Sequence, residues 1–172
     1  VEVRSFISKE KYEELLKYFK EKGKLLKVEE DETEYYAENG AVRIKQNQAS
    51  AKIVLKTGDI HDEFREEYEI PKQKKDFPIY QKMFEKLNIP KQIKWKRKKH
   101  TFNWEGTTVE LGDNKGYGYI IEIEKITDDA GKEQALKLLK EKFSILKIKI
   151  TPREEFEKAY NSYKQNWREL IK

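Results

Sequence analysis

The stretch G-Y-G-Y-I-I-E-I-E, residues 116–124, carries the pattern that decides the fold. Successive side chains of a β-strand point to opposite faces, so Glu122 and Glu124 share one face while Ile121 and Ile123 share the other. The same alternation of charged and apolar residues recurs in V-E-V-R (1–4), V-R-I-K (42–45), A-K-I-V-L-K (51–56) and R-E-E-Y-E-I (65–70). The sequence therefore predicts a sheet with one charged face and one apolar face.

Turn residues and hydrophobic periodicity divide the rest of the chain into strands and helices. Strands are expected over 1–7, 24–37, 41–47, 51–57, 63–70, 93–104, 107–111 and 117–126, with turns at 38–40, 105–106 and 112–114. Helices are expected over 9–21, 76–87 and 130–141, and a last helix is expected to begin with a capping box formed by Thr151 and Glu154. No repeat or linker interrupts this series, so residues 1–172 are interpreted as a single α+β domain.

Composition excludes several kinds of chemistry. The 172 residues are 40% charged, yet 3 Trp, 10 Tyr and 8 Phe are enough to build a core, and a net charge of only +5 makes the arrangement of charges more important than their sum. The absence of Cys excludes disulfides, thiolate zinc sites and cysteine nucleophiles, and favours a reducing, cytoplasmic location. With only His61 and His100, a serine triad or a His-rich metal site has little support. No apolar run is long enough to predict a membrane span.

Two arrangements are compatible with the alternating strands. The sheet has either one solvated face and one face under helices, or it closes into a barrel with its charged side chains inside and amphipathic helices outside. Two carboxylates at the spacing of Glu122 and Glu124 can approach one divalent cation, while other strands supply Arg and Lys. Acid at one place and cations elsewhere suit a metal-bound polyphosphate, which favours the barrel.

The basic run K-W-K-R-K-K-H, residues 94–100, has three interpretations: a nucleic-acid patch, a solvated surface, or a strand with phosphate contacts. Cations occupy both faces of this strand, so either Arg97 and Lys99 or Lys96 and Lys98 point toward the charged face. On the last helix, Tyr160, Tyr163 and Trp167 lie near helical spacing and are expected to pack rather than to stack on bases.

Taken in order, these motifs resemble the CYTH family, the triphosphate tunnel metalloenzymes that include class IV adenylate cyclases and thiamine triphosphatases. V-E-V-R is similar to the family's E-x-E-x-K strand, with Glu2 as the second Glu and Arg4 in place of Lys. The first Glu has no counterpart here: either it precedes Val1 in the natural protein, or one metal or substrate contact of the family is absent. The later strands are similar to R-x-R/K at Arg43 and Lys45, to the lysine strand at Lys52 and Lys56, to R-x-E-x-E at Arg65, Glu67 and Glu69, to K-x-R at Arg97 and Lys99, and to G-x-G-x-[FY]-x-E-x-E at Gly116, Gly118, Glu122 and Glu124. The acidic residue usual before those glycines falls at Gly112, so Glu110 or Asp113 would replace it.

The resemblance implies a closed eight-stranded antiparallel β-barrel with helices packed outside, in one CYTH-like domain over 1–172. It implies Mg²⁺ or Mn²⁺ on Glu2, Glu122 and Glu124, which with Lys56 would be the catalytic residues. The implied substrate-binding residues are Arg4, Arg43, Lys45, Lys52, Lys56, Arg65, Arg97 and Lys99. Glu67, Glu69 and Glu110 are further candidates for the site.

The function expected first is a metal-dependent hydrolase of a triphosphate, either inorganic tripolyphosphate, a nucleoside triphosphate or thiamine triphosphate. The alternative is a class IV adenylate cyclase that makes cyclic AMP and pyrophosphate from ATP. A third reading is a non-catalytic module that binds polyphosphate or nucleic acid. The expected partner is a small-molecule triphosphate rather than nucleic acid or a membrane, and the expected state is a monomer or a homodimer.

Overall fold

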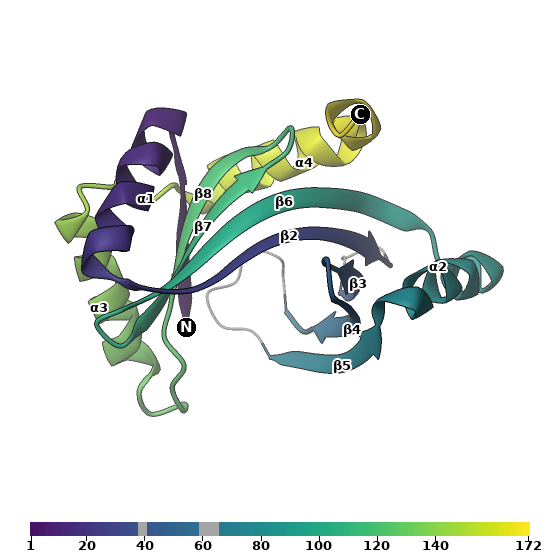
Figure 1. The fold of residues 1–172 in the computed structure, drawn as a ribbon, viewed down its shortest axis with the longest axis horizontal. Coiled ribbons are helices and arrows are strands. Elements are labelled where there is room, and N and C mark those ends of the chain that lie inside the picture. The colour runs from purple at the N-terminus through teal and green to yellow at the C-terminus, as the bar shows by residue number, and fades with distance from the viewer. Residues whose placement is uncertain (38–40, 59–65) are drawn as a thin grey trace.

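The computed structural model describes residues 1–37, 41–58 and 66–172 and has the predicted α+β architecture (Figure 1). The strands are β1 (Glu2–Ile7), β2 (Lys24–Tyr36), β3 (Val42–Gln46), β4 (Ser50–Lys56), β5 (Glu67–Gln73), β6 (Lys91–Trp104), β7 (Thr107–Asn114) and β8 (Gly118–Glu124). The helices are α1 (Lys9–Lys22), α2 (Phe77–Lys86), α3 (Lys132–Ile145) and α4 (Arg153–Leu170), and a short 3-10 turn, η1 (Lys74–Asp76), precedes α2.

All eight strands belong to one antiparallel sheet in the order β1-β8-β7-β6-β2-β3-β4-β5. The long ladder between β2 and β6 runs from the pair Lys24 and Asn103 to the pair Tyr36 and Lys91, and it joins the two halves of the sheet. In Figure 1, β2 and β6 arch over β3, β4 and β5, so the sheet is strongly curved. The concave face created by this curvature is the setting for the charged side chains.

The predicted closed barrel is not observed, because no ladder joins the edge strands β1 and β5 within the described part of the chain. Part of the free edge of β1 is occupied by another segment. The Phe6 backbone N–H donates to Thr151 Oγ1 at 3.0 Å, and the Thr151 N–H donates to Ser5 Oγ at 3.0 Å. The first contact uses the Phe6 backbone N–H, a donor that a ladder with another strand could otherwise have used.

Helices α1, α2 and α3 cover the convex face, as expected. The largest apolar cluster lies between helices α1 and α3 and strands β1, β6, β7 and β8. It includes Leu15, Phe19, Phe102, Ile121 and Phe143. A second cluster forms under α2, where Phe77 packs with Tyr36, Ile44 and Ala51. Burial of these large side chains supplies most of the driving force for holding the helices on the sheet.

Helix α4 departs from the expectation that all helices lie outside the barrel. Tyr163 and Trp167 of α4 pack with Tyr35, Ile93 and Trp95, which lie on the concave face of β2 and β6. The rings of Trp95 and Tyr163 are stacked with centroids 4.1 Å apart. Because this end of the concave face is aromatic rather than charged, it requires an apolar cover, and α4 provides it. Tyr163 and Trp167 are therefore packing residues, as predicted.

Two local expectations were wrong. Residues 112–114 continue β7 instead of forming a turn, because Gly112 and Asn114 remain in register with Ile120 and Gly118 of β8. Thr151 does not cap α4, since its hydroxyl accepts a bond from Phe6 of β1. The expected turn at 38–40, His61 and Arg65 lie outside the described residues. Among the described helices, none is both long and apolar enough to cross a bilayer.

Candidate functional site

A cavity of about 440 Å³ lies on the concave face of the sheet, and all eight strands contribute to its wall. Most predicted site residues meet there, although they come from segments more than a hundred residues apart. The lining consists of Val1, Glu2, Arg4, Thr33, Tyr35, Arg43, Lys45, Lys52, Val54, Lys56, Glu67, Arg97, Lys99, Glu110, Glu122 and Glu124. Glu69 is not in this lining, and Arg65 lies outside the described residues.

The acidic side of the cavity is built by three adjacent strands. Glu2 of β1 lies opposite Glu124 of β8, and Glu122 lies opposite both Arg4 of β1 and Glu110 of β7. Burial and the nearby charges of Glu2 and Glu110 raise the pKa of Glu122 to about 7. Burial and Glu2 also raise the pKa of Glu124. These carboxylates therefore repel one another and lack sufficient positive charge of their own.

This donor set fits the chemistry of Mg²⁺ or Mn²⁺, which prefer carboxylate oxygens. The raised pKa of Glu122 indicates that a cation placed among these carboxylates would relieve their repulsion. The side chains are not arranged as a finished metal site, since no three His, Cys, Asp or Glu side chains of the described residues converge closely enough to hold an ion. Binding of a divalent cation would thus require Glu2, Glu122 and Glu124 to turn toward a common point.

Of the two registers considered for the basic run on β6, the structure has the one that matches the family motif. Arg97 and Lys99 line the cavity, whereas Lys96 and Lys98 are excluded from its lining and have side chains that are 41% and 52% exposed. Lys99 Nζ donates to Glu110 Oε2 at 2.5 Å, which links the cationic side of the cavity to the acidic side. Although burial opposes its charge, Glu110 and Asp31 raise the pKa of Lys99, so this lysine is held as a cation.

Strands β3 and β4 supply further cations of the lining. Lys45 Nζ lies 3.2 Å from Asp31 Oδ2, and burial together with the charge of Lys99 lowers the pKa of Lys45. The Arg43 guanidinium lies 4.1 Å above the centre of the Tyr35 ring, which fixes its plane.

Lys52 and Lys56 each have an acidic partner on the neighbouring edge strand β5. Lys56 Nζ lies 2.6 Å from Glu67 Oε2, and Lys52 forms an ion pair with Glu69. Burial acts to raise the pKa of Glu67, but its hydrogen bonds with Lys56 and Glu69, together with the charges of Lys56 and Lys52, outweigh burial and lower the pKa overall. Glu67 and Glu69 are therefore partners of lysines rather than members of the carboxylate group on β1, β7 and β8.

Sequence reasoning missed three residues of β2 at this site, which are Asp31, Thr33 and Tyr35. Thr33 and Tyr35 line the cavity, and Asp31 lies behind Arg97 with a side chain that is 0% exposed. The segment V-E-E-D-E-T-E carries acids on both faces of the strand, so alternation alone does not reveal which of them point inward. Of the two substitutes considered for the family's acidic residue, Glu110 lines the cavity and Asp113 does not.

Comparison with solved structures identifies proteins of the same shape. A conserved hypothetical protein from Pyrococcus furiosus has a TM-score of 0.73 and 26% identity, over 89% of this chain and 95% of that chain. A "putative adenylate cyclase" from Vibrio parahaemolyticus has a TM-score of 0.66 and 13% identity, over 90% of this chain and 95% of that chain. A second protein so named, from Bacillus halodurans, has a TM-score of 0.64 and 16% identity, over 88% and 91%.

No family model matches the sequence, and no curated protein is similar enough to it to be matched. The likeness to known proteins is therefore seen in the structure and not in these sequence comparisons. Most residues of the motifs on which the resemblance was based line the concave face of the sheet, and the solved structures extend the likeness over nearly the whole chain. The chain has a CYTH-like fold, which confirms the resemblance at the level of the fold.

Proposed function

We propose that this protein is a metal-dependent hydrolase of a triphosphate, which binds in the cavity on the concave face. The observation that carries the proposal is the separation of charge around one cavity. Carboxylates gather on β1, β7 and β8, whereas Arg and Lys side chains gather on β3, β4 and β6. A linear polyphosphate needs a series of cations along its length, and its reacting end needs additional positive charge.

The cationic side would hold the phosphates that do not react. Arg43 and Arg97 present planar guanidinium groups, which can bind two phosphate oxygens at once, while Lys45, Lys52 and Lys99 act as point charges. These cations come from separate strands of one sheet, so the backbone fixes their spacing. Such a fixed array would stabilise charge during phosphoryl transfer without having to reorganise at the moment of reaction.

Glu2, Glu122 and Glu124 would hold Mg²⁺ or Mn²⁺, which when bound neutralises phosphate charge and helps to orient water as the nucleophile. Arg4 lies on the acidic side, with its Nη1 4.0 Å from Glu122 Oε1, and would balance negative charge there. Lys56 lines the cavity, and its charge acts on Glu124 of the acidic side. We assign to Lys56 the stabilisation of negative charge on the transferred phosphoryl group. Exchange of Lys56 from Glu67 to phosphate would bring this cation to the substrate when the substrate arrives.

A class IV adenylate cyclase is the second candidate, supported by the two structures that carry the name adenylate cyclase. The same cations would hold ATP, but the ribose hydroxyl would attack the α-phosphorus and pyrophosphate would leave. A non-catalytic polyphosphate-binding module is the third, since the carboxylates do not converge on a finished metal site in the described part of the chain.

One assay series separates these candidates. Phosphate, pyrophosphate and cyclic AMP are followed from tripolyphosphate, ATP and thiamine triphosphate, with Mg²⁺ or Mn²⁺ and with EDTA. Phosphate release that requires metal supports the hydrolase, and cyclic AMP with pyrophosphate supports the cyclase. Glu124→Gln should abolish turnover, whereas Glu14→Gln, on a side chain of α1 that is 65% exposed, should not. Binding without turnover in every condition would leave the binding module.

A further inference from the structure

We infer that Asp31 of β2 is a positioning residue, which orients the phosphate-binding cations of the cavity without touching the substrate. The inference rests on the proposed function, because it concerns how the same cavity recognises a triphosphate. Asp31 does not line the cavity, but its carboxylate lies directly behind three side chains that do, Arg97, Lys45 and Lys99. It therefore occupies the place from which the directions of these cations are set.

The contacts of Asp31 divide between its two oxygens. Oδ1 accepts from Arg97 Nε at 3.1 Å and from Arg97 Nη2 at 2.9 Å, and Thr33 Oγ1 donates to it at 3.2 Å. Arg97 Nη2 also donates to Thr33 Oγ1 at 2.9 Å, so Thr33 bridges the acid and the guanidinium. Oδ2 lies 3.2 Å from Lys45 Nζ and 3.8 Å from Lys99 Nζ. One carboxylate thus holds cations from β3 and β6.

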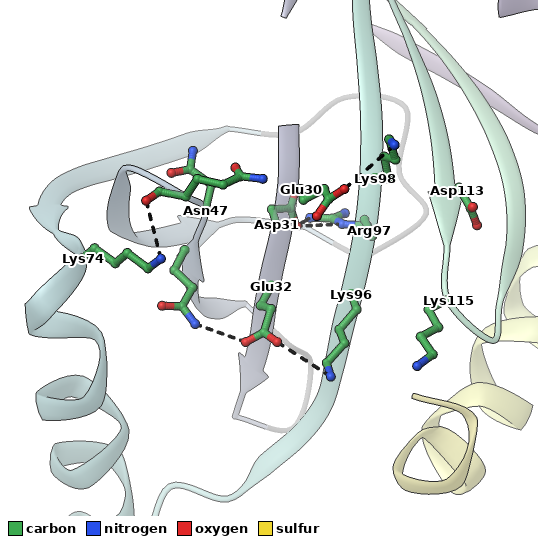
Figure 2. A pocket seen from close by; sticks show the side chains of 12 residues that line it. Glu30, Asp31, Glu32, Asn47, Lys74, Lys96, Arg97, Lys98, Asp113 and Lys115 are labelled. Carbon is green, nitrogen blue, oxygen red and sulfur yellow. Dashed lines mark hydrogen bonds and ion pairs between the residues drawn. The ribbon is translucent and has the colours of Figure 1, made fainter. Parts of the chain in front are cut away.

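Figure 2 shows this pair from an outer groove of the sheet, where Asp31 and Arg97 meet between β2 and β6. The groove and the cavity both have Arg97 in their walls, so the pair forms part of the partition between them. The neighbouring residue Glu30 pairs instead with Lys98, at 3.9 Å, and its side chain is 65% exposed. Of the ion pairs that join β2 and β6, the pair of Asp31 and Arg97 is thus buried at the cavity, whereas the pair of Glu30 and Lys98 lies on the surface.

Burial of a carboxylate is costly unless opposite charges surround it, and an apolar residue would serve stability as well at such a position. Burial acts to raise the pKa of Asp31, but Arg97, Lys45 and Lys99 outweigh it and lower the pKa to about 2. The acid is thus ionised at every pH at which the protein would work. A permanently ionised carboxylate behind the cavity gives the three cations a fixed partner and so orders them.

The cations need such a partner because they repel one another. Lys45, Arg97 and Lys99 lie within reach of the same carboxylate, and burial with the charge of Lys99 lowers the pKa of Lys45. Without Asp31, these side chains would move apart and Lys45 would more readily lose its proton. A cavity with disordered cations would still attract anions, but it would match the spacing of three linked phosphates less well. Asp31 is therefore expected to support discrimination by chain length.

The test compares Asp31→Asn, which keeps the shape of the side chain and removes its charge, with Glu30→Gln as the matched control on the same strand. Binding of tripolyphosphate and of pyrophosphate is measured by calorimetry in metal-free buffer, so that neither turnover nor metal affinity enters. Asp31→Asn should raise the Kd for tripolyphosphate about tenfold and the Kd for pyrophosphate about threefold, in line with the loss of a buried charge-assisted contact. Glu30→Gln should leave both values within about twofold.

Thr33→Val provides a second variant if Asp31→Asn does not fold, because it removes the bridging hydroxyl and keeps the volume. It should raise the Kd for tripolyphosphate about threefold, as expected for one lost hydrogen bond. Unchanged Kd values in a folded Asp31→Asn protein would overturn this inference but not the proposed function. If Asp31→Asn does not fold, unchanged Kd values in Thr33→Val would do the same. Tighter binding of tripolyphosphate would also overturn it, since Asp31 would then compete with the substrate. Failure of the wild-type protein to bind either anion would overturn the proposed function and this inference together.

Discussion

Substitution of Glu122 by Gln should stabilise the metal-free protein above pH 7 while abolishing its turnover. Glu122 lines the cavity beside Glu2 and Glu110, and burial with these two charges raises its pKa from 4.5 to about 7. A group whose pKa is raised by folding favours the protonated form in the folded state. Ionised Glu122 therefore destabilises the fold, and a neutral Gln of the same shape removes that penalty.

The magnitude follows from the pKa shift. One pKa unit corresponds to about 1.4 kcal/mol, so a rise from 4.5 to about 7 sets an upper limit of about 3 kcal/mol. The Glu122 side chain is 31% exposed, and screening by solvent reduces this to about 1–2 kcal/mol. For a chain of 172 residues, such a gain raises the Tm by about 3–6 °C.

The stability difference between Glu122→Gln and the wild type should depend on pH. Below about pH 4.5, Glu122 is protonated in both folded and unfolded states, so the variant and the wild type should be equally stable. The difference should grow between pH 4.5 and 7 and stay constant above pH 7. Addition of Mg²⁺ or Mn²⁺ should stabilise the wild type more than the variant, because the cation relieves the same repulsion.

Urea unfolding at pH 4, 6 and 8, with and without metal, measures these differences, with Glu14→Gln as a control for loss of an exposed charge. Glu14 lies on α1, and its side chain is 65% exposed. A Glu122→Gln protein that is less stable than the wild type at pH 8 would refute the reasoning. A stability difference of the same size at pH 4 and pH 8 would also refute it, since the effect would then not come from ionisation.

Three further changes test other parts of the structure. Lys56→Ala should lower kcat/KM for the triphosphate about tenfold or more, chiefly through kcat, since a hydrogen bond to a charged group contributes about 1.5–3 kcal/mol. Unchanged kcat and KM in steady-state kinetics would place Lys56 outside the site. Folding lowers the pKa of Asp31 from an ordinary 3.8 to about 2, so ionised Asp31 should contribute about 2 kcal/mol to the free energy of unfolding above pH 4. This contribution is lost as the pH falls toward 2. In acid unfolding, Asp31→Asn should not show this decrease in stability. Gly116→Ala should lower the Tm more than Gly118→Ala. Both glycines have positive φ, but only a Cβ at Gly116 would meet the side chain of Leu170, at 2.5 Å. An equal fall in Tm for the two variants would contradict this packing.

Much of the site could be predicted because strand alternation is a local property. Lys52 and Lys56, or Glu122 and Glu124, lie two or four residues apart on single strands, so each pair necessarily shares a face. The sequence also predicted most strand boundaries within a few residues. It was less informative where several polar residues are adjacent, as at Asp31, because both faces of β2 then look alike.

Features that depend on distant contacts could not be predicted in the same way. Capping by Thr151 was expected from its local sequence, but a hydrogen bond with Phe6, 145 residues away, takes up its hydroxyl. The place of α4 depends on the aromatic end of the concave face, where Tyr35 and Trp95 come together only in the folded sheet. Whether the sheet closes likewise depends on contacts between β1 and β5, which are at opposite ends of the strand order, so the local sequence of either strand does not decide it.

The most direct test of the central claim is a crystal structure of the protein with tripolyphosphate and Mn²⁺, in which anomalous scattering locates the metal. We expect Mn²⁺ among Glu2, Glu122 and Glu124, and the phosphates against Arg43, Lys45, Lys52, Arg97 and Lys99. A polyphosphate bound on the outer face, at Lys96 and Lys98, with the cavity free of both ions, would contradict it.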